Sequence, residues 1–322
     1  MANSRNQPAR PIYLVPTTGS IAEAQNAFGS LRLLLAQRKI HSIAKTWAML
    51  RGIGVGIVAI AAPIITFVLP TSAVVIGAVA GVWIVLSRTV FASLERHYSG
   101  KGAVIQEQFD MTIFGMLPTP ARVPEVTPEL ISRTVGTDDA AKAMIGKQSL
   151  RDWYPLELAL DGASAIAIAQ RANAAYSERL LTLNARVWLA LTLVWSLATI
   201  ALSIGLGLKL ETFLLGVALP LLPALLDVID QWRHTRQASK ERLNLANIIE
   251  EAIKNSDDEP INPEDLLVWQ DQLFALRRDA PQVSNLLYWL TRKKNEVAMS
   301  AGARDLSDVA KSHSKTANGG SA

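Results

Sequence analysis

Four short segments carry the side chains that could do chemistry in this 322-residue chain. Each segment sets amide, carboxylate, guanidinium or aromatic groups among apolar neighbours. Polar groups in such surroundings normally pair with one another, so the pattern taken alone favours buried hydrogen-bond networks that fix a helical fold. The residues are Gln106, Glu107 and Asp110; Trp153 and Tyr154; Gln170, Arg171 and Asn173; and Gln270, Asp271 and Arg277.

The residues required for most catalysis and metal binding are absent or scattered. No cysteine occurs, which excludes disulfides, thiolate metal sites and a thiol nucleophile. The four histidines, His41, His97, His234 and His313, have no partner at helical spacing. Neither a P-loop nor a G-x-S-x-G nucleophile motif is present. We therefore expect no enzyme activity, no metal site and no cofactor.

Two glycine patterns lie in apolar segments. The run Gly52-Ile-Gly-Val-Gly56 resembles a dinucleotide-binding loop only superficially, because such a loop follows a strand and this one lies in an apolar helix. Gly77 and Gly81 have the small-xxx-small spacing that lets membrane helices approach closely. We interpret both patterns as helix packing, the second within or between subunits.

The elements that must position these residues are organised around one uncharged stretch, Gly52 to Ser87. Its 36 residues would form a helix about 54 Å long, whereas a bilayer core of about 30 Å needs only about 20 residues. Pro70 lies near its middle, where a proline can end one helix and begin another. The stretch therefore predicts a transmembrane hairpin, with Arg51 and Arg88 at its ends.

A second hairpin is predicted further along the chain. Val187–Leu208 has 22 uncharged residues, enough for one tilted span, and a turn around Lys209 follows. Thr212–Leu226 has only 15, so the fourth span must extend to about Ile229 and put Asp227 near the headgroups. The alternative, buried hairpins of a soluble protein, is disfavoured because such apolar stretches would overfill its core.

The cations predict the orientation. Of 32 Lys and Arg residues, seven precede the first hairpin, 11 lie between the hairpins, 13 follow the second, and only Lys209 is on the far side. Short Lys- and Arg-rich loops stay in the cytoplasm, so both termini are expected there. The basic excess lies next to the first span, which favours contact with the lipid bilayer over a nucleic-acid polymer.

The third predicted span carries a row of hydroxyl groups. Thr192, Ser196, Thr199 and Ser203 fall on one face of a helix. No ionisable group lies at the centre of a span, which fits a pore lined by hydroxyls better than an ion-coupled transporter. The alternative is that each hydroxyl bonds its own helix backbone, and the sequence leaves the two open.

Local signals predict where the other helices begin and end. Ser20 and Glu23 have capping-box spacing. The run Ser99–Gly102 should break the helix that follows the second span. A helix should begin near Pro155 and continue into the third span, unless Gly162 interrupts it.

Together these patterns predict an all-α membrane protein in which four transmembrane helices form two hairpins and continue into a helical cytoplasmic domain. The expected order is an extended arm (1–19), a cytoplasmic helix (20–50), the first hairpin (51–91), a cytoplasmic domain with the helix leading to the third span (92–186), the second hairpin (187–229), C-terminal cytoplasmic helices (230–300) and a disordered tail (301–322).

Several segments, taken in order around the two hairpins, resemble the four-transmembrane pore-forming effector family found beside second-messenger nucleotidyltransferases in bacterial antiphage operons. They are Ala36–Arg38 with Ala44 and Lys45, Ile105–Asp110 with Phe114, Trp153 with Tyr154, Gln170–Asn173, and Trp269–Phe274 with Arg277, Pro281, Tyr288, Arg292, Glu296 and Met299. The chain departs from the family at Met116–Pro118, where a tryptophan is usual, and at Tyr176–Ser177, where an aromatic-acidic pair is usual.

The resemblance implies a dormant inner-membrane protein of a CBASS-type abortive-infection system. It implies that the cytoplasmic part senses a cyclic oligonucleotide from a partner nucleotidyltransferase and that a pore then opens and depolarises the cell. It further implies that Arg38, Arg171 or Arg277 meets phosphate and that Trp153 or Tyr154 stacks on a base.

The other polar residues of the four segments are further ligand-binding candidates. A homo-oligomer is expected, because four spans are too few to enclose a wide pore. The alternatives are a constitutive channel or small-solute transporter, and a membrane scaffold.

Overall fold

The computed structural model describes residues 13–69, 71, 73–116 and 126–319. Within these ranges all regular secondary structure is helical. The elements are α1 (Thr18–Asn26), α2 (Phe28–Val68), α3 (Ala73–Leu86), the π-helical turn η2 (Ser87–Phe91), α4 (Ala92–Phe114), α5 (Pro128–Val135), α6 (Asp138–Gln148), α7 (Gly162–Gly205), α8 (Leu210–Phe213), the π-helical turn η3 (Leu214–Ala218), α9 (Leu219–Lys254), α10 (Pro263–Arg278) and α11 (Asn285–Gly319).

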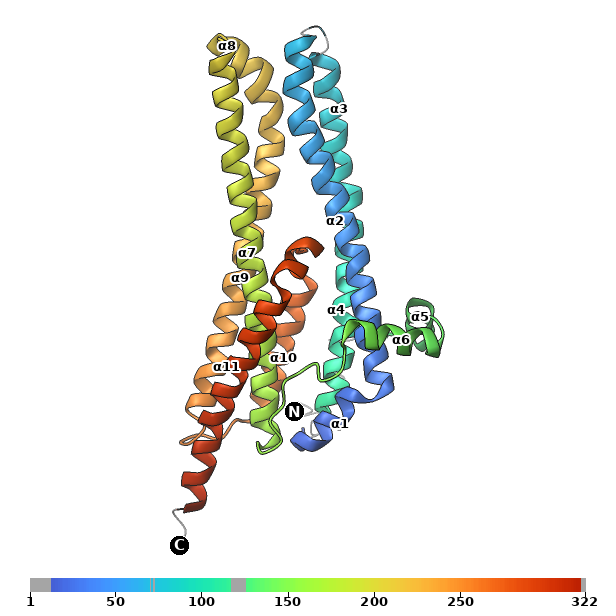
Figure 1. Cartoon of the computed structure of the whole chain (residues 1–322), viewed down its shortest axis with the longest axis vertical. Helices are drawn as coiled ribbons and strands as arrows, with labels where there is room; N and C mark the ends of the chain where they lie inside the picture. The colour runs from blue at the N-terminus through green and yellow to red at the C-terminus, as the bar shows by residue number, and fades with distance from the viewer. Residues whose placement is uncertain (1–12, 70, 72, 117–125, 320–322) are drawn as a thin grey trace, which may run out of the picture.

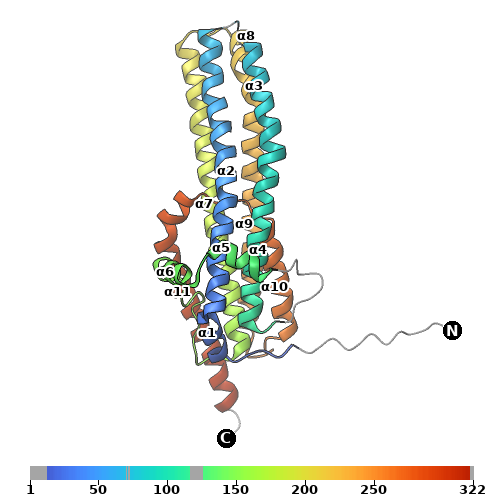
Figure 2. The ribbon, with the colours of Figure 1, turned by 90° about the vertical axis from the view of Figure 1, so that its right-hand side faces the viewer.

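Four long rods run side by side along the molecule (Figures 1 and 2). They are α2, the continuous α3–η2–α4 helix, α7, and the continuous α8–η3–α9 helix. α2 ends at Val68 and α3 begins at Ala73, so the chain turns back around the predicted position. Pro70 itself lies outside the described residues.

One half of the rods exposes apolar side chains. The stretches Val74–Phe114 and Gly162–Gly205 are each long and apolar enough to cross a bilayer, and none of the most apolar part of the second is buried. A core helix of a soluble protein would bury such a surface. In the predicted first and fourth spans some side chains lie outside the description, although Ile57, Ile64 and Leu219 are likewise exposed.

Polar side chains mark the level at which this apolar surface ends. Arg88 pairs with Asp227 at 3.0 Å, and Arg51 pairs with Glu95 at 3.2 Å and bonds Gln231 at 3.1 Å. The Arg88–Asp227 and Arg51–Gln231 bonds join the two pairs of rods, because Arg51 and Arg88 belong to the first pair and Asp227 and Gln231 lie on α9 of the second. We term these residues the polar belt, and the part of the molecule beyond it, away from the apolar halves, the head.

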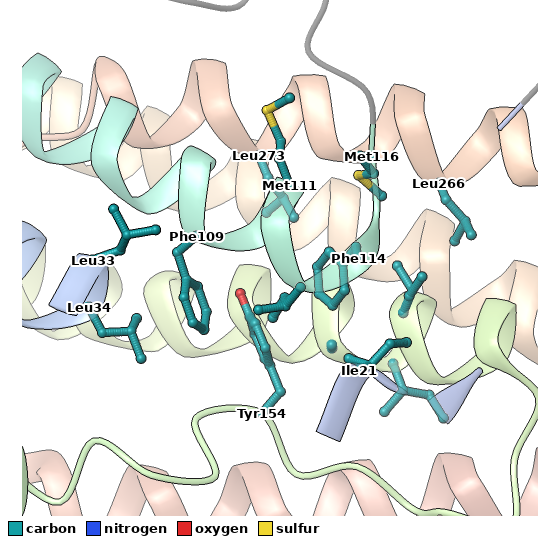
Figure 3. Packing of buried hydrophobic residues seen from close by; sticks show 14 of the residues in the cluster. Ile21, Leu33, Leu34, Phe109, Met111, Phe114, Met116, Tyr154, Leu266 and Leu273 are labelled. Carbon is teal, nitrogen blue, oxygen red and sulfur yellow. The ribbon is translucent and has the colours of Figure 1, made fainter. Parts of the chain in front are cut away.

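The core lies in the head, where α1, α10, α11 and the segment before α7 pack on the rods (Figure 1). Figure 3 shows Tyr154, from the segment before α7, reaching toward Phe109 and Phe114 of α4. The ring centroids of these two residues lie 6.3 and 5.6 Å from that of Tyr154. Leu34 of α2 and Ile21 of α1 are fully buried beside them.

The first helix begins earlier than the capping-box spacing predicted. The hydroxyl of Thr17, an extended residue, accepts the amide hydrogen of Ser20 at 3.3 Å and caps α1. Ser20 therefore lies inside the first turn, and the capping-box assignment is wrong. α1 also stops at Ala27, whose backbone is extended, before α2 begins.

The predicted helix break at Ser99–Gly102 is wrong, because α4 continues through it to Phe114. Gly102 is needed for helix contact: a Cβ atom there would lie 2.7 Å from Nε2 of His41 on α2. A glycine can thus signal a close approach between two helices as well as a helix end.

α7 begins at Gly162 and not near Pro155 as predicted. The carboxylate of Asp161 accepts the amide hydrogen of Ser164 at 3.0 Å and caps the helix. Residues 149–161, which precede this cap, are therefore not helical. This non-helical segment carries Trp153 and Tyr154 into the head.

The predicted disordered tail is wrong for the described residues, because α11 continues from Asn285 to Gly319. Ala303, Leu306 and Ala310 recur at helical spacing and are buried in the core. Three small or apolar contacts in a polar sequence thus hold this helix against the head, although its composition suggests a tail.

Candidate functional site

Most of the predicted polar side chains meet in one buried cluster in the head. The residues come from α4, α7, α10 and the segment before α7, so the cluster joins the first hairpin to the second and to the C-terminal helices. We term it the buried polar network: Glu107, Asp110, Tyr154, Gln170, Gln270 and Arg277, with the half-buried Asn173 at its edge.

An ion pair lies at the centre of the network. Nη1 of Arg277 is 2.6 Å from Oδ2 of Asp110 and 3.5 Å from Oε2 of Glu107. Nε2 of Gln270 donates to the same two oxygens, at 3.1 Å and 2.7 Å respectively. The side chain of Arg277 is 8% exposed and that of Asp110 is fully buried, so these bonds replace water around the charges.

The rest of the network ties this pair to α7. The hydroxyl of Tyr154 donates to Oδ1 of Asp110 at 2.8 Å and accepts from Asn173 at 3.2 Å. Gln170 donates to Oε1 of Gln270 at 3.1 Å. The bonds thus run without interruption from α4 through the ion pair to α7 and α10.

The electrostatics of the network favour a structural role. Burial alone would lower the pKa of Arg277, but Asp110, Tyr154 and Glu107 together raise it. Burial and then the charge of Asp110 raise the pKa of Tyr154 well above its usual value. The guanidinium of Arg277 is therefore charged and the phenol of Tyr154 is neutral. Asp110 and Glu107 already pair with this guanidinium, so it is not available to bind a phosphate.

A second cluster, with a different character, lies between α2, the segment before α7 and the start of α11. The guanidinium carbon of Arg38 lies 5.2 Å from the ring centroid of Trp153. Its Nη1 donates to the carbonyl of Gln148 at 3.2 Å, and its Nη2 donates to the hydroxyl of Tyr288 at 3.5 Å. Nζ of Lys45 lies 5.1 Å from the ring centroid of Tyr288. We term Arg38, Lys45, Trp153 and Tyr288 the cation–aromatic cluster.

The cations of this cluster repel each other. Burial and then the charge of Arg38 lower the pKa of Lys45 to about 8, and burial lowers that of Arg38. Within the described part of the chain neither cation forms a salt bridge. The nearby Glu296 pairs with Arg292 at 2.6 Å, and its charge favours the charged form of Arg38 only in part. An anion bound here would relieve the repulsion, and the rings offer faces for stacking.

Three predicted ligand residues lie apart from both clusters. Arg171 of α7 pairs with Glu250 of α9 at 2.7 Å. Gln106 is half-buried on α4, and Asp271 is exposed on α10. The structure thus brings Arg38 and Trp153 together, and separately most of the others in the buried polar network.

The predicted pore hydroxyls bond their own helix. Thr192, Thr199 and Ser203 each donate to the backbone carbonyl four residues earlier, at 2.8, 2.9 and 2.8 Å. This is the alternative that the sequence left open, and Ser196 is half-buried beside them.

The two glycine patterns differ in their surroundings. Gly54 packs directly on the indole of Trp83, which agrees with helix packing in the 52–56 run. Gly77 and Gly81 face outward on α3, and no described atom lies within 4 Å of a Cβ built on either. Within the described residues, no other helix of this chain packs against these two glycines.

The sequence reasoning missed a basic groove beside α2. It has a volume of about 670 Å³ and is lined by Lys39 of α2, Lys101 of α4 and Arg133 of α5. Lys39 also donates to the carbonyl of Thr134 at 3.1 Å. These cations come from three distant segments, so their spacing in the sequence carried no signal. The described residues contain no cluster of three His, Cys, Asp or Glu side chains suited to a metal.

Comparison with known proteins gives two matches. Residues 19–306 match the family model described as the SMODS-associating 4TM effector domain. A probable CBASS effector molecule of Bacillus cereus (strain VD146) is 22% identical over 223 residues, which cover 69% of this chain and 74% of that protein. No solved structure matches significantly.

Proposed function

The chain belongs to the SMODS-associating 4TM effector family, and from this premise we propose that it is a membrane effector of a CBASS-type antiphage system that a cyclic oligonucleotide opens. Four transmembrane helices in two hairpins would cross the bacterial inner membrane, with both termini and the head in the cytoplasm. The exposed apolar halves of the rods and the polar belt support this arrangement. The similar Bacillus cereus protein carries the description of a probable CBASS effector.

The observation that carries the proposal is the cation–aromatic cluster. Burial and then the charge of Arg38 lower the pKa of Lys45, burial lowers that of Arg38, and neither cation forms a salt bridge within the described residues. A guanidinium and an ammonium suit the phosphates of a cyclic oligonucleotide, and Trp153 suits a base. The ligand would take the place of the Tyr288 hydroxyl on Arg38.

The arrangement of helices supports a route from this cluster to the membrane. Arg38 and Lys45 lie on α2, which continues as one helix to Val68 in the first hairpin. Tyr288 lies on α11, which packs along α7, the helix of the third span. A ligand that separates Tyr288 from Arg38 would therefore loosen the link between the two hairpins in the head. The buried polar network would keep the head folded while they move.

We propose that the hairpins of several copies then part to form a pore that depolarises the cell. Thr192, Ser196, Thr199 and Ser203 would face the opening, and the hydroxyls of Thr192, Thr199 and Ser203 would have to turn from their own helix backbone toward it. A constitutive channel is the competing function; it would conduct without any ligand. A membrane scaffold would not conduct at all.

Calorimetric titration of the detergent-purified full chain with a panel of cyclic di- and trinucleotides tests the sensing step. We expect one of them to bind, Arg38→Met to weaken its binding, and Lys101→Met with Arg133→Met to leave the affinity unchanged. The reverse result would move the phosphate site to the basic groove. If no cyclic oligonucleotide binds while the protein still arrests growth, direct sensing is excluded.

A further inference from the structure

Each rod of the first hairpin has a weak point next to the polar belt. In α2 it is the run Gly52-Ile-Gly-Val-Gly56, which directly follows Arg51 of the belt. In the other rod it is the π-turn η2, which contains Arg88 of the belt; there the amide of Ala92 donates to the carbonyl of Ser87, five residues earlier. Glycine favours a helix less than any residue except proline, and π-turns are a recurrent cause of helix bends.

Close packing accounts for only the middle glycine of the run. Gly54 lies directly against the indole of Trp83. A Cβ atom on Gly52 would meet Trp188 of α7 at 3.8 Å, an ordinary contact distance, and a Cβ on Gly56 would have no described atom within 4 Å. Alanine would therefore fit at both positions and would strengthen the helix. Since contact does not require these two glycines, the property they add to α2 is a softer backbone.

The two weak points lie beside each other. Phe91, the last residue of η2, stacks on Trp47 of α2 with the ring centroids 5.8 Å apart. Trp83, four residues before η2, packs on Gly54. Figures 1 and 2 show the two rods running side by side through this level. A hairpin can change direction only where both of its helices can bend, and these contacts bring the two soft segments to one place.

Buried polar groups at η2 are not fully paired. Ser87 is 1% exposed, and neither its hydroxyl nor the indole N–H of Trp83 has a hydrogen-bond partner within the described residues. A buried polar group without a partner destabilises the arrangement that buries it. A bend at η2 would therefore break no side-chain hydrogen bond of these two groups and could pair or hydrate them.

The second hairpin has no such pair of weak points at this level. Between Gly162 and Gly205, which lie at its two ends, α7 contains no glycine, and α9 contains none at all. The π-turn η3 lies near the outer turn, next to α8 (Figure 1). Arg88, inside η2, pairs with Asp227 of α9 at 3.0 Å. The softer hairpin is thus tied to the stiffer one at the point where it can bend.

We propose that the first hairpin bends at the polar belt, with Gly52–Gly56 and η2 as the two sides of a hinge, while the second hairpin keeps its direction. The Arg88–Asp227 pair restrains the bend. This inference rests on the proposed transmembrane arrangement and adds to it the movement that opens the pore. A bend here changes the angle between the outer half of the first hairpin and the head, and so carries a change in the head into the bilayer.

Distances between pairs of spin labels test the hinge, because the chain has no native cysteine. Val268→Cys, 51% exposed on α10, places one label in the head. The second label is at Ile64→Cys, 55% exposed in the outer half of α2, or at the matched control Leu202→Cys, 60% exposed in the outer half of α7. The full chain is reconstituted in lipid nanodiscs without ligand, and double electron–electron resonance gives the distance distribution of each pair.

We expect the Ile64 pair to give a broader distribution than the Leu202 pair. Arg88→Met removes the restraint, so it should broaden the Ile64 pair further and leave the Leu202 pair unchanged. The hinge is refuted if the two pairs are equally narrow both with and without Arg88→Met. It is equally refuted if Arg88→Met broadens both pairs alike, because the whole bundle then loosens.

The role of the glycines has its own matched control. Gly52→Ala with Gly56→Ala should narrow the Ile64 pair to the width of the Leu202 pair. Gly77→Ala with Gly81→Ala makes the same change in α3, beyond the hinge, and should leave the Ile64 pair broad. If both double variants narrow it, or if neither does, a hinge at the belt is ruled out.

The outcomes for the hinge and for the proposed function are separate. The distances are measured without ligand, so a failed hinge leaves the proposed sensing step standing. A chain that does not insert into the nanodisc would overturn the transmembrane arrangement and the hinge with it.

Discussion

The guanidinium of Arg277 lies 2.6 Å from the carboxylate of Asp110, in the centre of the head and almost out of reach of water. This pair joins α10 to α4 and so connects the C-terminal helices to the first hairpin. Burying two charges costs more than their attraction returns unless further hydrogen bonds surround them. Gln270 and Tyr154 supply those bonds, so the network should be most sensitive to the loss of one charge.

Replacing Arg277 by methionine tests this. The variant leaves the carboxylates of Asp110 and Glu107 buried without their cation, and we expect it to lower the free energy of unfolding by about 3–5 kcal/mol. Arg278→Met is the matched control, because the neighbouring Arg278 is exposed, forms its ion pair with Asp279 at the surface and lies 6.0 Å from the Phe274 ring centroid. Its effect should stay within about 0.5 kcal/mol. Thermal unfolding of the purified full chain measures both, and equal effects would contradict a central role for the ion pair.

Arg38 and Trp153 should control the response to the signal and not the stability of the fold. Losing a charge-assisted bond to phosphate costs about 1.5–3 kcal/mol, so Arg38→Met should weaken binding of the active cyclic oligonucleotide by about 10- to 100-fold. Trp153→Leu should weaken it through lost stacking. Arg236→Met is the control. Arg236 forms a similar cation–aromatic pair, 5.4 Å from the ring of Trp232 on α9, but lies outside the cluster, so its loss should leave the affinity unchanged. Unchanged affinity in both cluster variants, measured by calorimetry, would rule this site out.

Binding should depend on pH through Lys45. Its pKa is lowered from 10.5 to about 8, so the folded chain releases this proton as the pH rises through 8 while the unfolded chain keeps it. Between about pH 8 and 10.5 this residue therefore makes the folded state more stable as the pH rises. An anionic ligand has the opposite preference, since it favours the charged amine. We expect affinity to fall between pH 7 and pH 9, with proton uptake on binding near pH 8.

Calorimetry at pH 8 in buffers of different ionisation enthalpy measures that uptake. In Lys45→Arg the cation stays charged, so proton uptake should disappear and affinity should vary little with pH. Proton uptake that persists in Lys45→Arg would assign the titration to another group.

Two glycines of α4 should respond in opposite directions to the same substitution. A Cβ on Gly102 meets the imidazole of His41, whereas a Cβ on Gly100 has only the side chain of Arg278 at 4.0 Å. Gly102→Ala should thus destabilise the head by about 1–3 kcal/mol through overpacking. Gly100→Ala should stabilise it by up to about 1 kcal/mol through helix propensity. Thermal unfolding compares them, and a stabilising Gly102→Ala would show that α2 and α4 can separate freely.

The sequence predicted the parts of the fold that depend on composition over many residues. Uncharged stretches of 36 and 22 residues identified apolar rods, and α2 ends and α3 begins on either side of the predicted turn. The polar segments around Asp110, Tyr154, Gln170 and Arg277 do meet in a buried network, as their apolar neighbours suggested.

Features that depend on tertiary contact were not predictable. Gly102 looks like a helix break until His41 is known to lie against it. The tail after residue 301 is polar in composition, yet contacts at Leu306 hold it as a helix. The basic groove combines Lys39, Lys101 and Arg133 from separate helices. In each case the residues that determine the structure contact one another from different helices, so their spacing in the sequence gives no signal.

Ion flux through the purified full chain, reconstituted in sealed vesicles, tests the central claim most directly. We predict that vesicles holding a potassium gradient keep their potential until the active cyclic oligonucleotide is added and then lose it. Arg38→Met vesicles should need about 10- to 100-fold more of this ligand to lose it. A potential that collapses before any ligand is added, or that no cyclic oligonucleotide ever collapses, would contradict a ligand-opened pore.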